Sequence, residues 1–211
     1  MTGVKPAAAG AGILPTMRHA TLDVIHEEHQ ALAAMLRSLS LLLAQARREG
    51  HLPDFSVLRA MLLYVDEFPE RLHHRKESEL LFPALLRRAP ELADAVARLE
   101  RDHAQGERAI RDLQHALLAF EVLGEPRRAD FERAVEQYVR GYLEHMGVEE
   151  AEILPAARRV FNEGDWAALD AAFAANQDPL TGHEPPPDYA PLFHKIVMMA
   201  PAPIGLGPAG A

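Results

Sequence analysis

Two short stretches of the chain place a glutamate four residues after a histidine: His73 with Glu77, and His145 with Glu149. On a helix, residues four apart project from the same side, so this imidazole and carboxylate can bind one metal centre. Imidazole and carboxylate ligands together suit iron, manganese or zinc. The pairs therefore indicate a metal site, although a single pair of this kind is also common on an exposed helix face.

Two further histidines, His29 and His103, lie on apolar helical patterns of their own. Six polar groups facing one interior would be costly to bury without a metal or partners. Such a set could hold a pair of ions, with Glu77 and Glu149 bridging them. The predicted metal ligands are His29, His73, Glu77, His103, His145 and Glu149.

The chain has 11 histidines and no cysteine, which excludes disulfides, iron–sulfur clusters, thiolate zinc sites and a thiol nucleophile.

The candidate ligands belong to an internal repeat. Residues 73–83 read HHRKESELLFP and residues 145–155 read HMGVEEAEILP. Each contains H-x-x-x-E, an apolar pair and a proline ten residues after the histidine. EEHQAL around His29 and ERDHAQ around His103 also match. The repeat predicts two helical hairpins, each supplying one histidine from its first helix and a histidine with a glutamate from its second.

Apolar residues spaced three and four apart predict four long helices that would position these side chains. The patterns run from Leu22 to Leu43, from Leu58 to Glu77, from Leu92 to Phe120 and from Phe131 to Ile153. Expected boundaries are a stop at Gly50, an N-cap at Asp54, a kink at Pro69, and ends near Gly124 and Pro155. A shorter helix, from about Trp166 to Ala175, is expected to follow Asp165 as its cap.

These patterns predict an all-α fold, an antiparallel four-helix bundle with a short extra helix and a proline-rich tail. Three parts are expected: an N-terminal arm (1–17), the bundle with its following helix (18–176) and the tail (177–211). The tail contains the segment DYAPLFHKIVMMA, which is too apolar to remain free in water. We expect it to dock, either on its own bundle near the helix around Trp166 or in a homodimer, or on another partner.

The charge of the chain restricts its partners. It has 31 acidic and 22 basic residues, for a formal net charge of −9. Nucleic acids and anionic membranes select basic surfaces, so neither is expected as a partner. Because no signal-peptide pattern or spanning apolar segment is visible, a cytoplasmic location is expected.

At these residues the sequence resembles the hemerythrin-like (HHE, cation-binding) family. The stretches that carry the resemblance are HEEHQAL, FPERLHHRKESELLFPAL, LERDHAQG and YLEHMGVEEAEILP, in the family's order, and they cover about residues 18–160. The resemblance implies that the six predicted ligands bind two non-haem iron ions. It further implies an oxo or hydroxo bridge between the two ions.

The sequence differs from the oxygen-carrying hemerythrins at two positions. Glu107 stands where their third helix has a second histidine, and Glu150 where their fourth has an aspartate. This implies a more symmetric centre, with Glu107 as an extra or labile ligand, and argues against reversible oxygen carriage. Iron-centre repair proteins of the superfamily resemble this pattern more closely, but usually add an N-terminal domain with cysteines.

Several neighbours of the predicted ligands have expected roles of their own. His74 is about 100° around the helix from His73 and is expected to face outward. His26 could approach the edge of the site. Tyr142 is either core packing or a donor to an oxygen species at the metal, and Gly106 leaves either a ligand pocket or close helix packing. The acidic residues directly before predicted ligands are expected to be solvated: Glu28, Asp102 and Glu144.

Three functions fit this sequence. The first is a di-iron module that binds or senses oxygen, nitric oxide or iron. The second is an enzyme acting on peroxide or dioxygen, or a stress or iron-centre repair factor; the third is a helical scaffold without metal. No nucleophile or substrate-binding motif stands out, which favours binding over catalysis.

Overall fold

The chain folds into helices joined by short turns. The computed structural model describes residues 18–202 and 204–207, and no strand occurs among them. The predicted N-terminal arm (1–17) lies outside the described residues. The α-helices are α1 (Ala20–Arg48), α2 (Phe55–Val65), α3 (His74–Lys76), α4 (Phe82–Arg88), α5 (Ala93–Leu123), α6 (Arg128–Val148), α7 (Leu154–Val160), α8 (Glu163–Phe173) and α9 (Ala190–Met199).

Short helical segments of other types extend or connect these helices. The π-helical segments are η1 (Asp66–His73), η2 (Glu77–Leu81) and η5 (Glu149–Ile153). The 3-10 segments are η3 (Pro90–Leu92), η4 (Glu125–Arg127), η6 (Pro179–Thr181) and η7 (Pro187–Tyr189).

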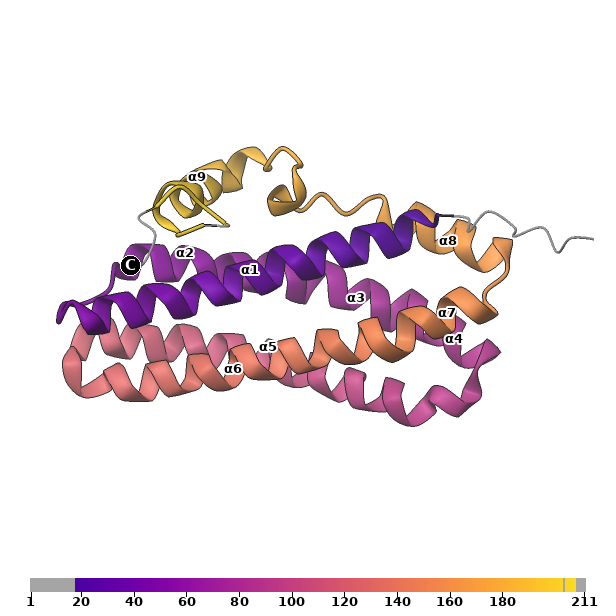
Figure 1. The fold of residues 1–211 in the computed structure, drawn as a ribbon, viewed down its shortest axis with the longest axis horizontal. Helices are drawn as coiled ribbons and strands as arrows, with labels where there is room; N and C mark the ends of the chain where they lie inside the picture. Colours follow the sequence, from indigo (N-terminus) through magenta and orange to yellow (C-terminus); the bar gives the residue numbers. More distant parts are fainter. Residues whose placement is uncertain (1–17, 203, 208–211) are drawn as a thin grey trace, which may run out of the picture.

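Four helical rods run alternately in opposite directions along the long axis of the molecule (Figure 1). The first rod is α1, and the second continues from α2 through η1, α3 and η2 to α4. The third is α5, and the fourth continues from α6 through η5 to α7. Helices α1 and α5 each contact both α2 and α6, which closes the ring of rods. The predicted antiparallel four-helix bundle is confirmed.

The ends of the rods follow local sequence signals, with one exception. The Asp54 carboxylate accepts hydrogen bonds from the backbone N–H groups of Ser56 and Val57, as expected of an N-cap. Gly124 ends α5 with a φ of 74°, a conformation that favours glycine. The prediction that the fourth helix ends near Pro155 is wrong. Proline is tolerated in the first turn of a helix, so α7 carries the rod on to Val160.

Prolines accompany all three π-helical segments. Pro83 and Pro155 each come two residues after a π-helical segment, and Pro69 lies inside η1, where the sequence predicts a kink. Proline has no N–H, so it removes a hydrogen bond of the regular helix and leaves the backbone free to form a wider turn. The two H-x-x-x-E repeats therefore share a local structure, in which Glu77 and Glu149 are the first residues of wide turns.

The interior of the bundle consists of two apolar clusters. One includes Met35, Leu36 and Phe120, and the other includes Ile25 and Leu99. Fully burying one such side chain contributes about 1.5–3 kcal/mol, so both clusters stabilise the rods strongly. The predicted metal ligands lie between the clusters: along α1, for example, His29 separates Ile25 from Leu32 of the first cluster.

Helix α8 covers one side of the bundle by packing on α1. It begins at Glu163, and its cap is Asn162 rather than the predicted Asp165. The Asn162 side chain accepts from the Asp165 backbone N–H, while the Asp165 carboxylate accepts from the Asn162 backbone N–H. Asp165 is thus the second member of a reciprocal capping box rather than the cap itself.

The apolar tail segment forms α9, which docks on the chain's own bundle (Figure 1). Phe193 packs edge-to-face against Tyr64 of α2 and Phe68 of η1, at ring-centroid distances of 5.7 and 5.3 Å. The expectation that the tail docks near Trp166 is wrong. Trp166 belongs to the other apolar cluster and stacks on His19. The aromatic side chains at the α2–η1 junction provide the surface instead.

Candidate metal centre

The structure brings the six predicted ligands together in the middle of the bundle. Each of the four rods contributes one histidine, and the second and fourth rods each add a glutamate. All six residues are buried, with exposed fractions between 0% and 7%. His73 is the last residue of η1 and Glu77 is the first residue of η2, with the short helix α3 between them. Glu149 is the first residue of η5, four residues after His145.

The four imidazoles form two close pairs. The Nε2 atoms of His29 and His73 are 3.2 Å apart, and those of His103 and His145 are 3.1 Å apart. Within each pair the two nitrogens are too close for both to carry protons aimed at each other. One proton between the two nitrogens, or a metal ion facing both lone pairs, would account for this approach.

Each glutamate reaches one histidine of each pair with a different oxygen. Glu77 Oε1 lies 3.2 Å from His73 Nε2, and its Oε2 lies 3.5 Å from His103 Nε2. Glu149 Oε2 lies 3.3 Å from His29 Nε2, and its Oε1 lies 3.3 Å from His145 Nε2. Two carboxylates placed in this way could each be shared between two ions.

The buried carboxylates test whether this donor set fits metal ions. All four oxygens of Glu77 and Glu149 are inaccessible to solvent and accept no hydrogen bond. A buried, unpaired carboxylate is strongly unfavourable unless a cation compensates its charge. Nitrogen and oxygen donors around two adjacent positions fit a pair of transition-metal ions. The role of these six residues as ligands stays a prediction.

Three of the histidines are oriented by acceptors behind their rings. His29 Nδ1 donates to Glu150 Oε1 at 3.1 Å, and His73 Nδ1 donates to Glu28 Oε2 at 2.6 Å. His103 Nδ1 donates at 2.9 Å to the hydroxyl of Ser78, which donates in turn to Glu100. A proton held at Nδ1 leaves the Nε2 lone pair facing inward, as metal ligation requires.

His145 differs from the other three because its Nδ1 has no hydrogen-bond partner. Asp102 Oδ2 lies 3.7 Å from this nitrogen, within ion-pair distance but beyond a hydrogen bond. Asp102 is partly exposed and Glu144 is exposed, whereas Glu28 is 8% exposed. The expectation that Glu28 is solvated is wrong, because the side chains of α1, η1 and the segment after α8 enclose it. Its Oε2 also accepts from Asn176 Nδ2 at 3.0 Å.

Protonation in the metal-free protein follows from these contacts. Burial alone lowers the pKa of His29, but the neighbouring Glu149 and Glu150 carboxylates outweigh it and raise the pKa to about 9. For Glu77, burial favours a higher pKa, but the charges of His73 and His103 outweigh it and hold the pKa well below its usual value. A metal ion must therefore displace protons from the imidazoles.

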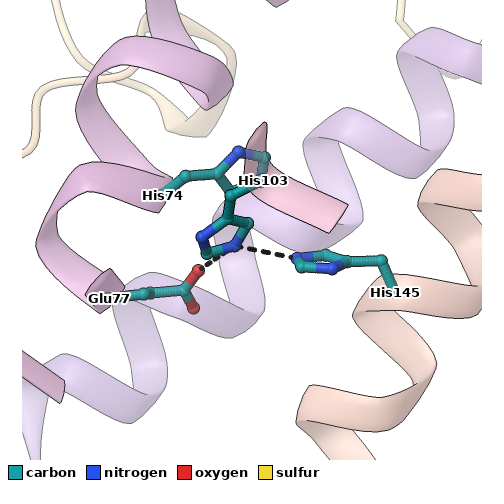
Figure 2. Close-up of side chains that lie close together, drawn as sticks. All are labelled: His74, Glu77, His103 and His145. Atoms are coloured by element: carbon teal, nitrogen blue, oxygen red, sulfur yellow. Dashed lines mark hydrogen bonds and ion pairs between the residues drawn. The ribbon is translucent and has the colours of Figure 1, made fainter. Parts of the chain in front are cut away.

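The structure adds a buried residue that the sequence placed at the surface. His74 is 5% exposed, because the second rod lies between α1 and α5 and both sides of it are covered. Its ring stacks on His103 at 4.1 Å, and Figure 2 shows it beside Glu77, His103 and His145. These four residues offer ligand atoms within 4.8 Å of one another. His74 also has other partners, since its Nδ1 lies 3.2 Å from Glu70 Oε2.

Glu70 is a second residue that the sequence analysis missed. It is 3% exposed, and its Oε1 accepts hydrogen bonds from Tyr142 at 2.7 Å and Tyr138 at 2.9 Å. A Cβ atom at Gly106 would lie 2.8 Å from Glu70 Oε1, so Gly106 makes room for this carboxylate. The i, i+4 spacings of Glu70 with His74 and of Tyr138 with Tyr142 are sequence signals that could have revealed this cluster.

The remaining candidates lie outside the centre. Glu107 is exposed and pairs with Arg111 at 3.1 Å, so the expectation that it serves as an extra ligand is wrong. Glu150 holds His29 and His26 through the same oxygen, each at 3.1 Å. His26 is therefore at the edge of the site, as expected.

Comparison with known families agrees with this geometry. The family model of the hemerythrin HHE cation binding domain matches residues 20–157, which include all six predicted ligands. The search of curated proteins gave no match. Among the described residues, no helix has the length and apolar character needed to cross a membrane. The chain belongs to the hemerythrin HHE cation-binding family.

Proposed function

We propose that this protein binds two non-haem iron ions and uses them to bind or sense a small diatomic ligand, oxygen or nitric oxide. The observation that carries the proposal is the pair of buried carboxylates, whose four oxygens lack hydrogen bonds and face four imidazole nitrogens. His29, His73, Glu77, His103, His145 and Glu149 would hold the ions. Bound iron would supply the affinity for a diatomic molecule.

The chain's own residues supply the surroundings of that centre. Glu28, Glu150 and Ser78 orient three imidazoles through their Nδ1 atoms. The two apolar clusters exclude water along the bundle axis on either side. At one edge, the Tyr142 hydroxyl donates to Glu70 and lies 3.4 Å from His74 Nε2, which keeps polar groups close to the buried ligands.

Metal analysis of a double variant tests the proposal. The wild type should bind two iron ions per chain, whereas Glu77→Gln with Glu149→Gln should lose most of both, because each carboxylate serves both positions. The matched control is Glu79→Gln with Glu152→Gln, which changes two exposed glutamates on the same π-helical segments. Iron content in the first variant equal to the wild type would contradict the assignment.

Ligand binding separates sensing from catalysis. Mixing the reduced iron protein with nitric oxide or oxygen should give a stoichiometric absorption change that follows ligand concentration. Multiple turnovers of hydrogen peroxide, at a rate proportional to enzyme concentration and without a stable ligand complex, would instead support the enzyme alternative.

A further inference from the structure

A groove between α5 and α6 leads to one edge of the candidate centre. Its volume is about 520 Å³, within the range of about 300–1,000 Å³ typical of small-molecule sites. The inner end is formed by His74, Tyr142 and His145. Small residues also line the groove, among them Ala109 of α5 and Gly141 of α6.

The inner end of the groove holds a polar group without a hydrogen-bond partner. His145 is 4% exposed, and its Nδ1 accepts and donates no hydrogen bond. Asp102, whose Oδ2 is 3.7 Å from that nitrogen, lines the same groove. Because buried polar atoms are rarely left unsatisfied, this atom marks a position where a bound molecule can make a hydrogen bond.

The charges of the groove select the kind of molecule. Asp102 and Asp112 line it, and none of the described residues lining it is a lysine or arginine. Behind the inner end lies the buried Glu70 carboxylate. Because the Asp102 and Asp112 carboxylates repel an anion, they favour a neutral or cationic molecule in the groove.

We infer that the α5–α6 groove binds a small neutral or cationic organic molecule, with its apolar body against the small residues and its polar head at Tyr142 and His145. The site stands on the groove itself and does not require iron. It would place such a molecule beside the candidate centre, where its binding can alter the surroundings of His103 and His145.

Three probes that share one ring but differ in charge test the inference: benzamidine, benzyl alcohol and benzoate. Binding is followed by nuclear magnetic resonance, through the methyl signal of Ala109 and the amide signal of Gly141, in the metal-free and the zinc-loaded full chain. Benzamidine and benzyl alcohol should shift these signals with dissociation constants of about 1–10 mM, as expected for fragments of this size. Benzoate should bind at least tenfold more weakly.

A matched pair of variants localises the binding. Gly141→Leu should weaken both binding probes at least tenfold, because a Cβ at Gly141 meets nothing within 4 Å and the side chain would fill the groove. Gly147→Leu, on the same helix and also without a neighbour within 4 Å, lies outside the groove lining and should change nothing. Ala109→Leu on the opposite wall provides a second blocking variant, and circular dichroism checks that each folds.

The results distinguish the possible outcomes. Failure of benzamidine and benzyl alcohol to shift the groove signals in either form overturns the inference, as does equal binding of benzoate. Binding that Gly141→Leu and Ala109→Leu leave unchanged places the probes elsewhere and also overturns it. The measurement in metal-free protein keeps this outcome separate from any failure of the iron proposal.

Discussion

The His29–His73 half of the candidate centre is held from outside, whereas the His103–His145 half is open on one side. The Glu150 carboxylate accepts a hydrogen bond from His29 Nδ1, and the Glu28 carboxylate accepts one from His73 Nδ1. Behind His103 the partner is a hydroxyl, whereas His145 Nδ1 has no hydrogen-bond partner, and His145 borders a groove. The internal repeat thus produces two equivalent sets of candidate ligands in two unequal surroundings. We interpret the first as the anchored half and the second as the half that a small molecule can approach.

Removal of Phe173 should have the largest effect, because this residue covers the anchored half. Its side chain is fully buried, and its ring lies edge-to-face to His73 at 6.3 Å. Phe173→Ala should lower the free energy of unfolding by about 3–5 kcal/mol, as truncation of a buried phenylalanine does. Urea denaturation measures this change.

The control for Phe173→Ala is Val122→Ala, at a site that is 70% exposed. That change should stay within about 0.5 kcal/mol of the wild type. Equal stability of the two variants would show that α8 does not support the anchored half.

Removing the outer acceptor of each half should affect metal affinity unequally. Glu28→Ala should weaken metal binding about 10–100-fold, because His73 loses the hydrogen bond that orients it. Asp102→Ala should weaken it less than about threefold, because no hydrogen bond to His145 is lost. Competition with a chelator of known affinity measures both. Equal losses, or a larger loss in Asp102→Ala, would remove the distinction between the halves.

The smallest predicted effect is a pH dependence of the metal-free protein. The pKa of His29 is about 9 in the folded chain, above the ordinary value of 6.5, so the folded state holds a proton that the unfolded state releases. The stabilisation is complete below pH 6.5 and is lost as the pH rises through about 9. Unfolding between pH 7.5 and 9 should therefore become easier.

Two comparisons sharpen the pH prediction. His29→Gln should show a shallower decline over the same range, because the titrating group is gone. Metal-loaded protein should show no such decline, since the ion has already displaced the protons. A metal-free wild type that gains stability between pH 7.5 and 9 would contradict the assigned protonation of the anchored half.

The convergence of the six candidate ligands could be predicted from sequence because each lies on an apolar stripe. A polar residue on a buried face must meet the polar residues of the other buried faces, whatever the details of the loops. The apolar character of the tail segment predicted that it docks, with its own bundle as one of the alternatives, but its expected place near Trp166 was wrong. The residues that receive the tail, Tyr64 and Phe68, belong to the second rod. Which face of that rod is left free for the tail depends on how the four rods pack.

The outer residues of the centre could not be predicted by helical periodicity. A regular rotation of 100° per residue places His74 at the surface, but His74 follows the wide turns of η1, and α1 and α5 cover both sides of its rod. Glu28 was assigned to solvent because its neighbour faces the core. Its burial depends on Asn176, which is distant in sequence and reaches it only in the folded chain.

The position of Asn176 in the chain has a consequence for the order of assembly. All six candidate ligands lie within the first 149 residues, so the ribosome completes them before it adds Asn176. A nascent bundle can therefore bring its ligands together while Glu28 is still uncovered on the side that the later segment closes. Hydrogen bonds from Asn176 to Glu28 and from Tyr64 to Asp178 form only once this segment has emerged. Synthesis thus gives the protein an interval in which all six candidate ligands are present while Glu28 still lacks its contact with Asn176.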